Sequence, residues 1–193
     1  QTMEEFDQGW GSILYSTTLP ETKKASRLHI AGGHDYVQVF VDGKYIGVLN
    51  RVKGETDITL PPCAKGAKFD LLVEAMGRIN FGRAIKDFKG IDGTVDLTID
   101  IDGNKFTASL RNWQNYLLPD TYEFAKQQTY QKLESVSPLN NGDRVPGYYK
   151  ATFNVNKVGD TFLNFETFGK GLVQKIFSMP NKTGMNLTIA KYL

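Results

Sequence analysis

The chain has 193 residues, of which 40% are hydrophobic and 23% charged, and its net charge is +2. This composition is that of a globular protein, and the balance of charges excludes a nucleic-acid surface recognisable from charge alone. One cysteine, Cys63, excludes an intrachain disulfide and a cysteine-based zinc cluster, and no apolar run approaches the roughly 18 residues that span a bilayer. We therefore expect no cofactor or metal, and neither nucleic acid nor a membrane as partner.

Aromatic and β-branched residues, punctuated by Gly and Pro, predict many short strands. In chain order these are 12–18, 26–31, 35–42, 44–49, 56–60, 67–75, 93–101, 105–110, 113–118, 148–155, 161–167 and 172–177. The Asp-Gly pairs at 42–43 and 102–103 predict tight hairpin turns. Period-two alternation predicts the core positions Val37, Val39, Val41, Phe69, Leu71 and Val73.

These elements predict an all-β fold, with an antiparallel β-sandwich over about 12–118. Only residues 121–128 suggest a helix, and Asp120 is its expected N-cap. Residues 1–136 form the expected sandwich domain and 137–147, rich in Pro, Asn and Gly, the expected linker. Residues 148–193 are expected to form an incomplete second β unit that packs on the first, because so few strands leave unpaired edges. The opening segment, QTMEEFDQGWGS, lacks the features of a signal peptide, and we expect it to lie inside a longer protein.

The common catalytic and ligand-binding motifs are missing: there is no GxSxG, no P-loop and no GxGxxG after a strand. Asp100, Asp102 and Asn104 superficially resemble a calcium loop, but the glutamate at its twelfth position is missing and a hairpin turn explains them better. His34, beside Asp35 in GGHD, could be a pH-tuned imidazole at a loop tip, but we favour an exposed loop histidine at a strand start. The sequence thus predicts no catalytic residue and no metal ligand.

Two segments could instead bind a sugar. Arg78, Asn80 and Phe81 follow the strongest predicted strand, and they combine polar groups with a flat apolar ring that can stack on a pyranose. The alternative is that Arg78 pairs with Glu74 or Asp87 and that Phe81 belongs to the core. Trp113 and Tyr116 could likewise form a sugar platform, but we favour their anchoring the edge of the sandwich. Spacing alone leaves these alternatives open.

A succession of motifs extends over nearly the whole chain, from Phe6 to Val173. The motifs are FDQGWGSILYSTTLP, LHIAGGHDYVQVFVDGKYIG, LLVEAMGRINFG, KDFKGIDGTV and LRNWQNYLLP, followed by PGYYKATFNV and DTFLNFETFGKGLV. In this order they resemble the non-catalytic region that follows the barrel in family 35 glycoside hydrolases, the β-galactosidases. After Val173 the sequence departs from the family pattern.

The resemblance implies a jelly-roll, galactose-binding-like sandwich that packs on a catalytic TIM barrel. It also implies a parent enzyme that removes terminal β-galactose with retention, using two barrel glutamates that this chain does not contain. In that family the loop carrying Arg78, Asn80 and Phe81 reaches toward the active site, and a Tyr usually stands where this chain has Phe81. The resemblance alone implies an exported, periplasmic or extracellular protein.

Three functions follow as hypotheses. The first is a non-catalytic accessory region of a β-galactosidase, with the catalytic barrel as partner and galactosides as ligands at the subsite edge. The alternative is a free-standing carbohydrate-binding module, which an open reading frame without barrel sequence upstream would favour. An enzyme in its own right is the least supported, because a catalytic carboxylate pair is not recognisable and histidines are few.

Overall fold

The computed structural model describes residues 1–119, 121–132, 147–154, 162, 164, 170–176 and 184–192. The chain divides into two compact units, Gln1–Pro119 and Asp120–Leu193. The first unit thus ends earlier than the boundary at residue 136 expected from composition. Of the expected linker 137–147, only Gly147 is described, and it begins a strand.

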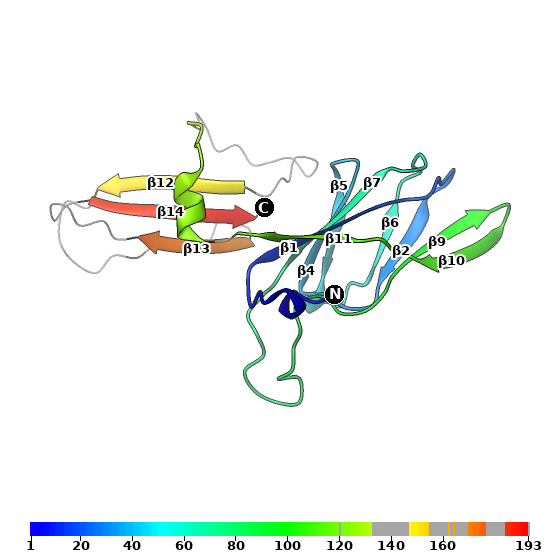
Figure 1. Cartoon of the computed structure of the whole chain (residues 1–193), viewed down its shortest axis with the longest axis horizontal. Coiled ribbons are helices and arrows are strands. Elements are labelled where there is room, and N and C mark those ends of the chain that lie inside the picture. The colour runs from blue at the N-terminus through cyan, green and yellow to red at the C-terminus, as the bar shows by residue number, and fades with distance from the viewer. Residues whose placement is uncertain are drawn as a thin grey trace. The chain divides into compact units, whose positions relative to one another are not determined.

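The first unit is an antiparallel β-sandwich (Figure 1). One sheet has the order β11 (Gln114–Leu118), β1 (Ser12–Thr18), β7 (Lys68–Glu74), β4 (Tyr36–Val41) and β5 (Lys44–Asn50). The other has the order β10 (Asn104–Ser109), β9 (Val95–Ile101), β2 (Ser26–Ile30) and β6 (Asp57–Leu60). A short pair, β3 (Gly33–His34) with β8 (Gly90–Ile91), and two 3-10 turns, Met3–Phe6 and Arg51–Lys53, were not predicted. The all-β sandwich itself is confirmed.

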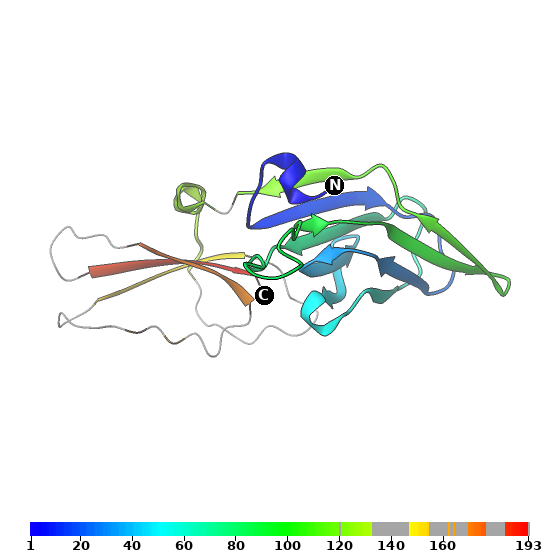
Figure 2. The same cartoon turned by 90° about the horizontal axis from the view of Figure 1, so that it is seen from below.

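Both sheets contribute to one hydrophobic core, and Figure 2 shows the two layers of the first unit from a second direction. Every predicted core position is buried: Val37, Val39, Val41, Phe69, Leu71 and Val73. The register of β7 is therefore as predicted. Its other face is buried too, because Asp70 and Leu72 are only 7% and 6% exposed.

Both predicted Asp-Gly turns are present. Asp42 and Gly43 have φ angles of 49° and 73°, and Asp102 and Gly103 have 51° and 86°. Two successive positive φ angles are typical of the two-residue turn that matches the twist of a hairpin, and Asp-Gly is a preferred pair there. Asp100 accepts a hydrogen bond from the Gly103 backbone N–H, so its carboxylate supports this turn.

The second unit contains a three-stranded antiparallel sheet, in the order β12 (Gly147–Asn154), β14 (Gly184–Tyr192) and β13 (Lys170–Ile176). The predicted helix is present as α1 (Tyr122–Gln127), but its N-cap is Thr121, whose hydroxyl accepts from the Phe124 N–H, and not Asp120. Strand β14 was not predicted, and the predicted strand 161–167 lies outside the described residues except for Phe162 and Asn164. None of the described helices is long and apolar enough to cross a membrane.

Candidate functional site: an aromatic loop on a buried charge cluster

The first set of predicted sugar-binding residues, Arg78, Asn80 and Phe81, lies on the segment between β7 and β8, residues 75–89, which we call the β7–β8 loop. In Figure 1 it is the blue-green loop that extends away from the sheets of the first unit. Phe81 is 89% exposed, and Asn80 is exposed beside it. The loop also exposes the large apolar side chains of Met76, Ile85 and Phe88. Phe81 is therefore not a core residue, and the loop presents several apolar side chains to the surroundings.

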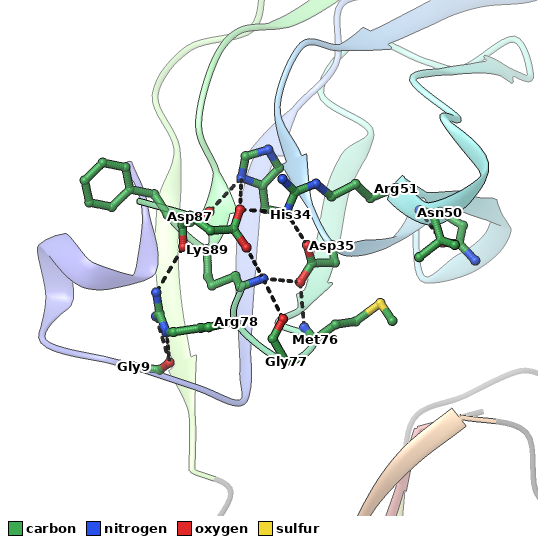
Figure 3. A network of polar contacts seen from close by, with 12 residues as sticks. Gly9, His34, Asp35, Asn50, Arg51, Met76, Gly77, Arg78, Asp87 and Lys89 are labelled. Atoms are coloured by element: carbon green, nitrogen blue, oxygen red, sulfur yellow. Dashed lines mark hydrogen bonds and ion pairs between the residues drawn. The ribbon is translucent and has the colours of Figure 1, made fainter. Parts of the chain in front are cut away.

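Four charged side chains form a compact cluster at the base of this loop, which we call the charged clasp: Asp35, Arg51, Asp87 and Lys89 (Figure 3). Lys89 Nζ lies 2.6 Å from Asp35 Oδ2 and 2.7 Å from Asp87 Oδ2. Arg51 Nη1 lies 2.7 Å from an oxygen of each of the same carboxylates. The Lys89 side chain is only 1% exposed, so this pairing is shielded from water. Two cations thus neutralise two carboxylates in a buried site.

The charged clasp holds both ends of the β7–β8 loop. At its beginning, the Met76 backbone N–H donates to Asp35 Oδ2 at 2.7 Å, and the Gly77 carbonyl accepts from Lys89 Nζ at 3.4 Å. Asp87 and Lys89 themselves lie at the end of the loop. Charge-assisted bonds therefore join the two ends, so the exposed tip is carried on a fixed base.

Arg78 lies close to the charged clasp but binds other partners. Its guanidinium donates to the Asp87 carbonyl, to the Gly9 carbonyl and to Glu4 Oε1. The sequence had offered Glu74 or Asp87 as side-chain partners; the structure shows Glu4 and two backbone carbonyls instead. Arg78 therefore joins the loop to the N-terminal segment, although its side chain remains 41% exposed.

His34 was predicted to be an exposed loop histidine at a strand start; it does lie just before β4, but it belongs to a short strand and is only partly exposed. It belongs to β3, its side chain is 21% exposed, and Nδ1 lies 2.6 Å from the Phe88 carbonyl and 3.9 Å from Asp87 Oδ1. The pairing of β3 with β8 brings the two segments together, and neither short strand was predicted. The imidazole thus lies against the end of the β7–β8 loop.

The second predicted pair, Trp113 and Tyr116, differs in burial and in contacts. Trp113 is partly buried and packs on the core, with its ring 6.4 Å from that of Tyr15 and 6.1 Å from that of Phe69. Its indole N–H donates to the Leu110 carbonyl. Tyr116 is half exposed, and its hydroxyl donates to Gln114. Trp113 therefore packs against the core of the sandwich, which is the interpretation favoured from the sequence.

The electrostatics of the charged clasp favour ionised carboxylates. Burial alone would raise the pKa of Asp35, but hydrogen bonds from Lys89, Arg51 and the Met76 N–H outweigh it and lower that pKa. The pKa of Asp87 is likewise lowered, because the bonds from Lys89 and Arg51 outweigh burial. These buried, paired carboxylates do not form an accessible acid and nucleophile of the glycosidase kind. Among the described residues, no group of three or more His, Cys, Asp or Glu side chains could hold a metal ion.

A pH dependence of stability follows. Both carboxyls have lower pKa values in the folded chain than in the unfolded chain, where an Asp titrates near pH 4. Their contribution to stability is thus present above about pH 4 and is lost as the pH falls through the folded pKa values. Urea unfolding at about pH 7 and about pH 3 should show a lower free energy of unfolding in acid. In Asp87→Asn the difference between the two pH values should be smaller; equal differences in both proteins would contradict this role for the charged clasp.

Comparison with known proteins relates the chain to one family. Residues 1–119 match the family described as "Beta-galactosidase, first all-beta domain", and this range coincides with the first compact unit. Proteins named beta-galactosidase from Xanthomonas manihotis, Bos taurus and Homo sapiens are 30%, 33% and 32% identical to the chain. Each comparison covers 89% of this chain, and 26%, 27% and 26% of the respective relative. The chain thus spans about a quarter of the length of these relatives.

Proposed function

Because the chain belongs to the family of the first all-beta domain of beta-galactosidase, we propose that it is an accessory β-sandwich region of a beta-galactosidase. In this proposal the chain itself supplies no catalytic residue. It packs against a separate catalytic domain, a TIM barrel of a retaining family 35 glycosidase, and follows that barrel in the sequence. The resemblance to exported enzymes of glycan breakdown supports a periplasmic or extracellular location.

One observation carries the proposal: an 89% exposed phenylalanine, Phe81, lies on a loop whose two ends are joined by buried ion pairs. An exposed aromatic ring on a fixed base is suited to contact another surface, because little conformational entropy is lost when it does so. We infer that this surface is the catalytic domain beside the galactose-binding subsite. Asn80 then lies at the edge of that subsite with Phe81, and Arg78 holds the loop in place.

A hydrolysis assay tests whether catalysis requires a domain outside this chain. The isolated chain should not hydrolyse a chromogenic β-galactoside, whereas the longer protein that contains a catalytic domain should. Turnover by the purified isolated chain would refute the accessory role. Barrel sequence immediately upstream in the same reading frame would support it, and a reading frame without a barrel would favour a free-standing carbohydrate-binding module.

Replacing Phe81 with alanine in the longer protein should lower kcat/KM about fivefold, because one stacking contact is worth about 1 kcal/mol. Phe81→Tyr keeps the ring and should retain the efficiency. The matched control is Phe106→Ala on β10, which also removes a largely exposed phenylalanine but lies at the other end of the first unit (Figure 1). Steady-state kinetics checks this; equal effects of Phe81→Ala and Phe106→Ala would contradict the contact.

A further inference from the structure

The most exposed large apolar side chains of the first unit lie on two segments beside the charged clasp. Phe81, Val52 and Ile85 are 89%, 76% and 60% exposed, and the other large apolar side chains of the first unit are less exposed. Phe81 and Ile85 belong to the β7–β8 loop, whereas Val52 belongs to the 3-10 turn Arg51–Lys53 that follows β5. Large apolar side chains exposed close together indicate an interaction surface.

The turn and the β7–β8 loop leave the sandwich at the same end. Strands β5 and β7 are both antiparallel to β4, and their last residues, Asn50 and Glu74, both stand opposite Tyr36. The charged clasp then joins the two segments, because Arg51 Nη1 lies 2.7 Å from Asp87 Oδ1. Figure 3 shows Arg51 reaching the charged clasp from the turn. The exposed side chains of both segments are therefore carried on one base.

The exposed charges of these two segments are all positive. Lys53, Arg83 and Lys86 are exposed, and none of them takes part in an ion pair within the described part of the chain. Asp87, the only acid on either segment, is buried and paired with two cations. A surface that combines apolar side chains with unpaired cations is complementary to a partner that presents carboxylates beside apolar groups.

From the shared base, the exposed apolar side chains and the unpaired cations, we propose that the turn and the β7–β8 loop dock together on an acidic surface of the catalytic domain. This inference rests on the proposed function and extends it, because it adds the Arg51–Lys53 turn to the contact and specifies the charge of the partner. About three quarters of the length of each relative lies outside the matched region, so such a protein has ample chain to supply the partner surface.

An anionic lipid surface is the competing partner, because apolar side chains beside cations also suit a membrane interface. Basic clusters that bind anionic lipids typically contain about 4–8 Lys or Arg side chains. The two segments offer three exposed, unpaired cations, and the net charge of the chain is only +2. These charges favour a protein partner.

Acetylation of lysines with an N-hydroxysuccinimide ester, followed by mass spectrometry, tests the contact. Lys53 and Lys86 should react readily in the isolated chain and several-fold more slowly in the longer protein that contains the catalytic domain. Lys23 and Lys65 are the matched controls, because they are also exposed but precede β2 and β7 at the opposite end of the first unit, where Thr22 and Cys63 bond to each other. Both controls should react equally in the two proteins.

A carbodiimide, which couples a lysine amine directly to a carboxylate, identifies the partner group. In the longer protein it should link Lys53 or Lys86 to an Asp or Glu of the catalytic domain, and Lys23 and Lys65 should form no such link. The isolated chain should not sediment with vesicles of phosphatidylcholine and phosphatidylserine.

Three results would overturn the proposal: equal acetylation of Lys53 and Lys86 in the two proteins, no link from either lysine to the catalytic domain, or sedimentation with vesicles that Lys53→Glu and Lys86→Glu remove. Failure of the accessory role itself is distinguishable. In that case the isolated chain would hydrolyse a β-galactoside, or the reading frame would contain no barrel.

Discussion

Replacing Lys89 with methionine should lower the free energy of unfolding by roughly 3–5 kcal/mol, the range found when one member of a buried ion pair is removed. Methionine keeps most of the side-chain volume, so the expected loss of stability comes from removing the positive charge. Asp35 and Asp87 remain buried, with side chains 5% and 3% exposed, and only Arg51 remains within the charged clasp to compensate two negative charges. Urea unfolding followed by tryptophan fluorescence measures this, because Trp10 and Trp113 both lie in the first unit.

Lys68→Met is the matched control. Lys68 also pairs with an aspartate, Asp70, at 3.0 Å, but its side chain is 62% exposed, so its loss should change stability by at most about 1 kcal/mol. A second substitution, Asp87→Asn, should recover part of the stability lost in Lys89→Met, since it leaves one carboxylate facing one guanidinium. Similar effects of Lys89→Met and Lys68→Met would show that the charged clasp contributes no more than a surface pair.

Replacing Leu71 with alanine should cost about 2–5 kcal/mol. Leu71 is fully buried at the middle of β7, and it is paired with Tyr15 of β1 and Val39 of β4. Its side chain belongs to the hydrophobic core that both sheets share, so truncation leaves a space among buried side chains. The cost of that space adds to the lost transfer free energy of the removed atoms.

Leu117→Ala on β11 is the matched control for Leu71→Ala, because it makes the same substitution in the same sheet. Leu117 is 43% exposed, so less apolar surface returns to water and little space opens. Its cost should be well below that of Leu71→Ala. Comparable costs for the two would contradict the assignment of Leu71 to the core.

The sequence predicted those features of the fold that depend on short stretches of the chain. Alternation placed Val37, Val39 and Val41 in the core, and the two Asp-Gly pairs placed the hairpin turns, because both signals depend on a few neighbouring residues. Strand β14 (GMNLTIAKY) was not predicted, although Met185, Leu187 and Ile189 alternate with Asn186 and Thr188 as in a strand. The short strands β3 and β8 have too few residues for any periodic signal.

The charged clasp could not be predicted in the same way. Its members come from positions 35, 51, 87 and 89, and only the folded sheets bring them together. Residue type alone does not distinguish Lys89, which is 1% exposed, from Lys86, which is exposed. The alternation in KDFKG is the one available hint, since it places Asp87 and Lys89 on one side of the chain and Phe88 on the other.

Oxidative footprinting of Phe81 tests the central claim, that the β7–β8 loop contacts a separate catalytic domain. Hydroxyl radicals should label Phe81 strongly in the isolated chain, where its side chain is 89% exposed. In the longer protein Phe81 should be protected, while Phe106, 55% exposed on β10, should be labelled equally in both proteins. Equal labelling of Phe81 in the isolated chain and in the longer protein would contradict the account.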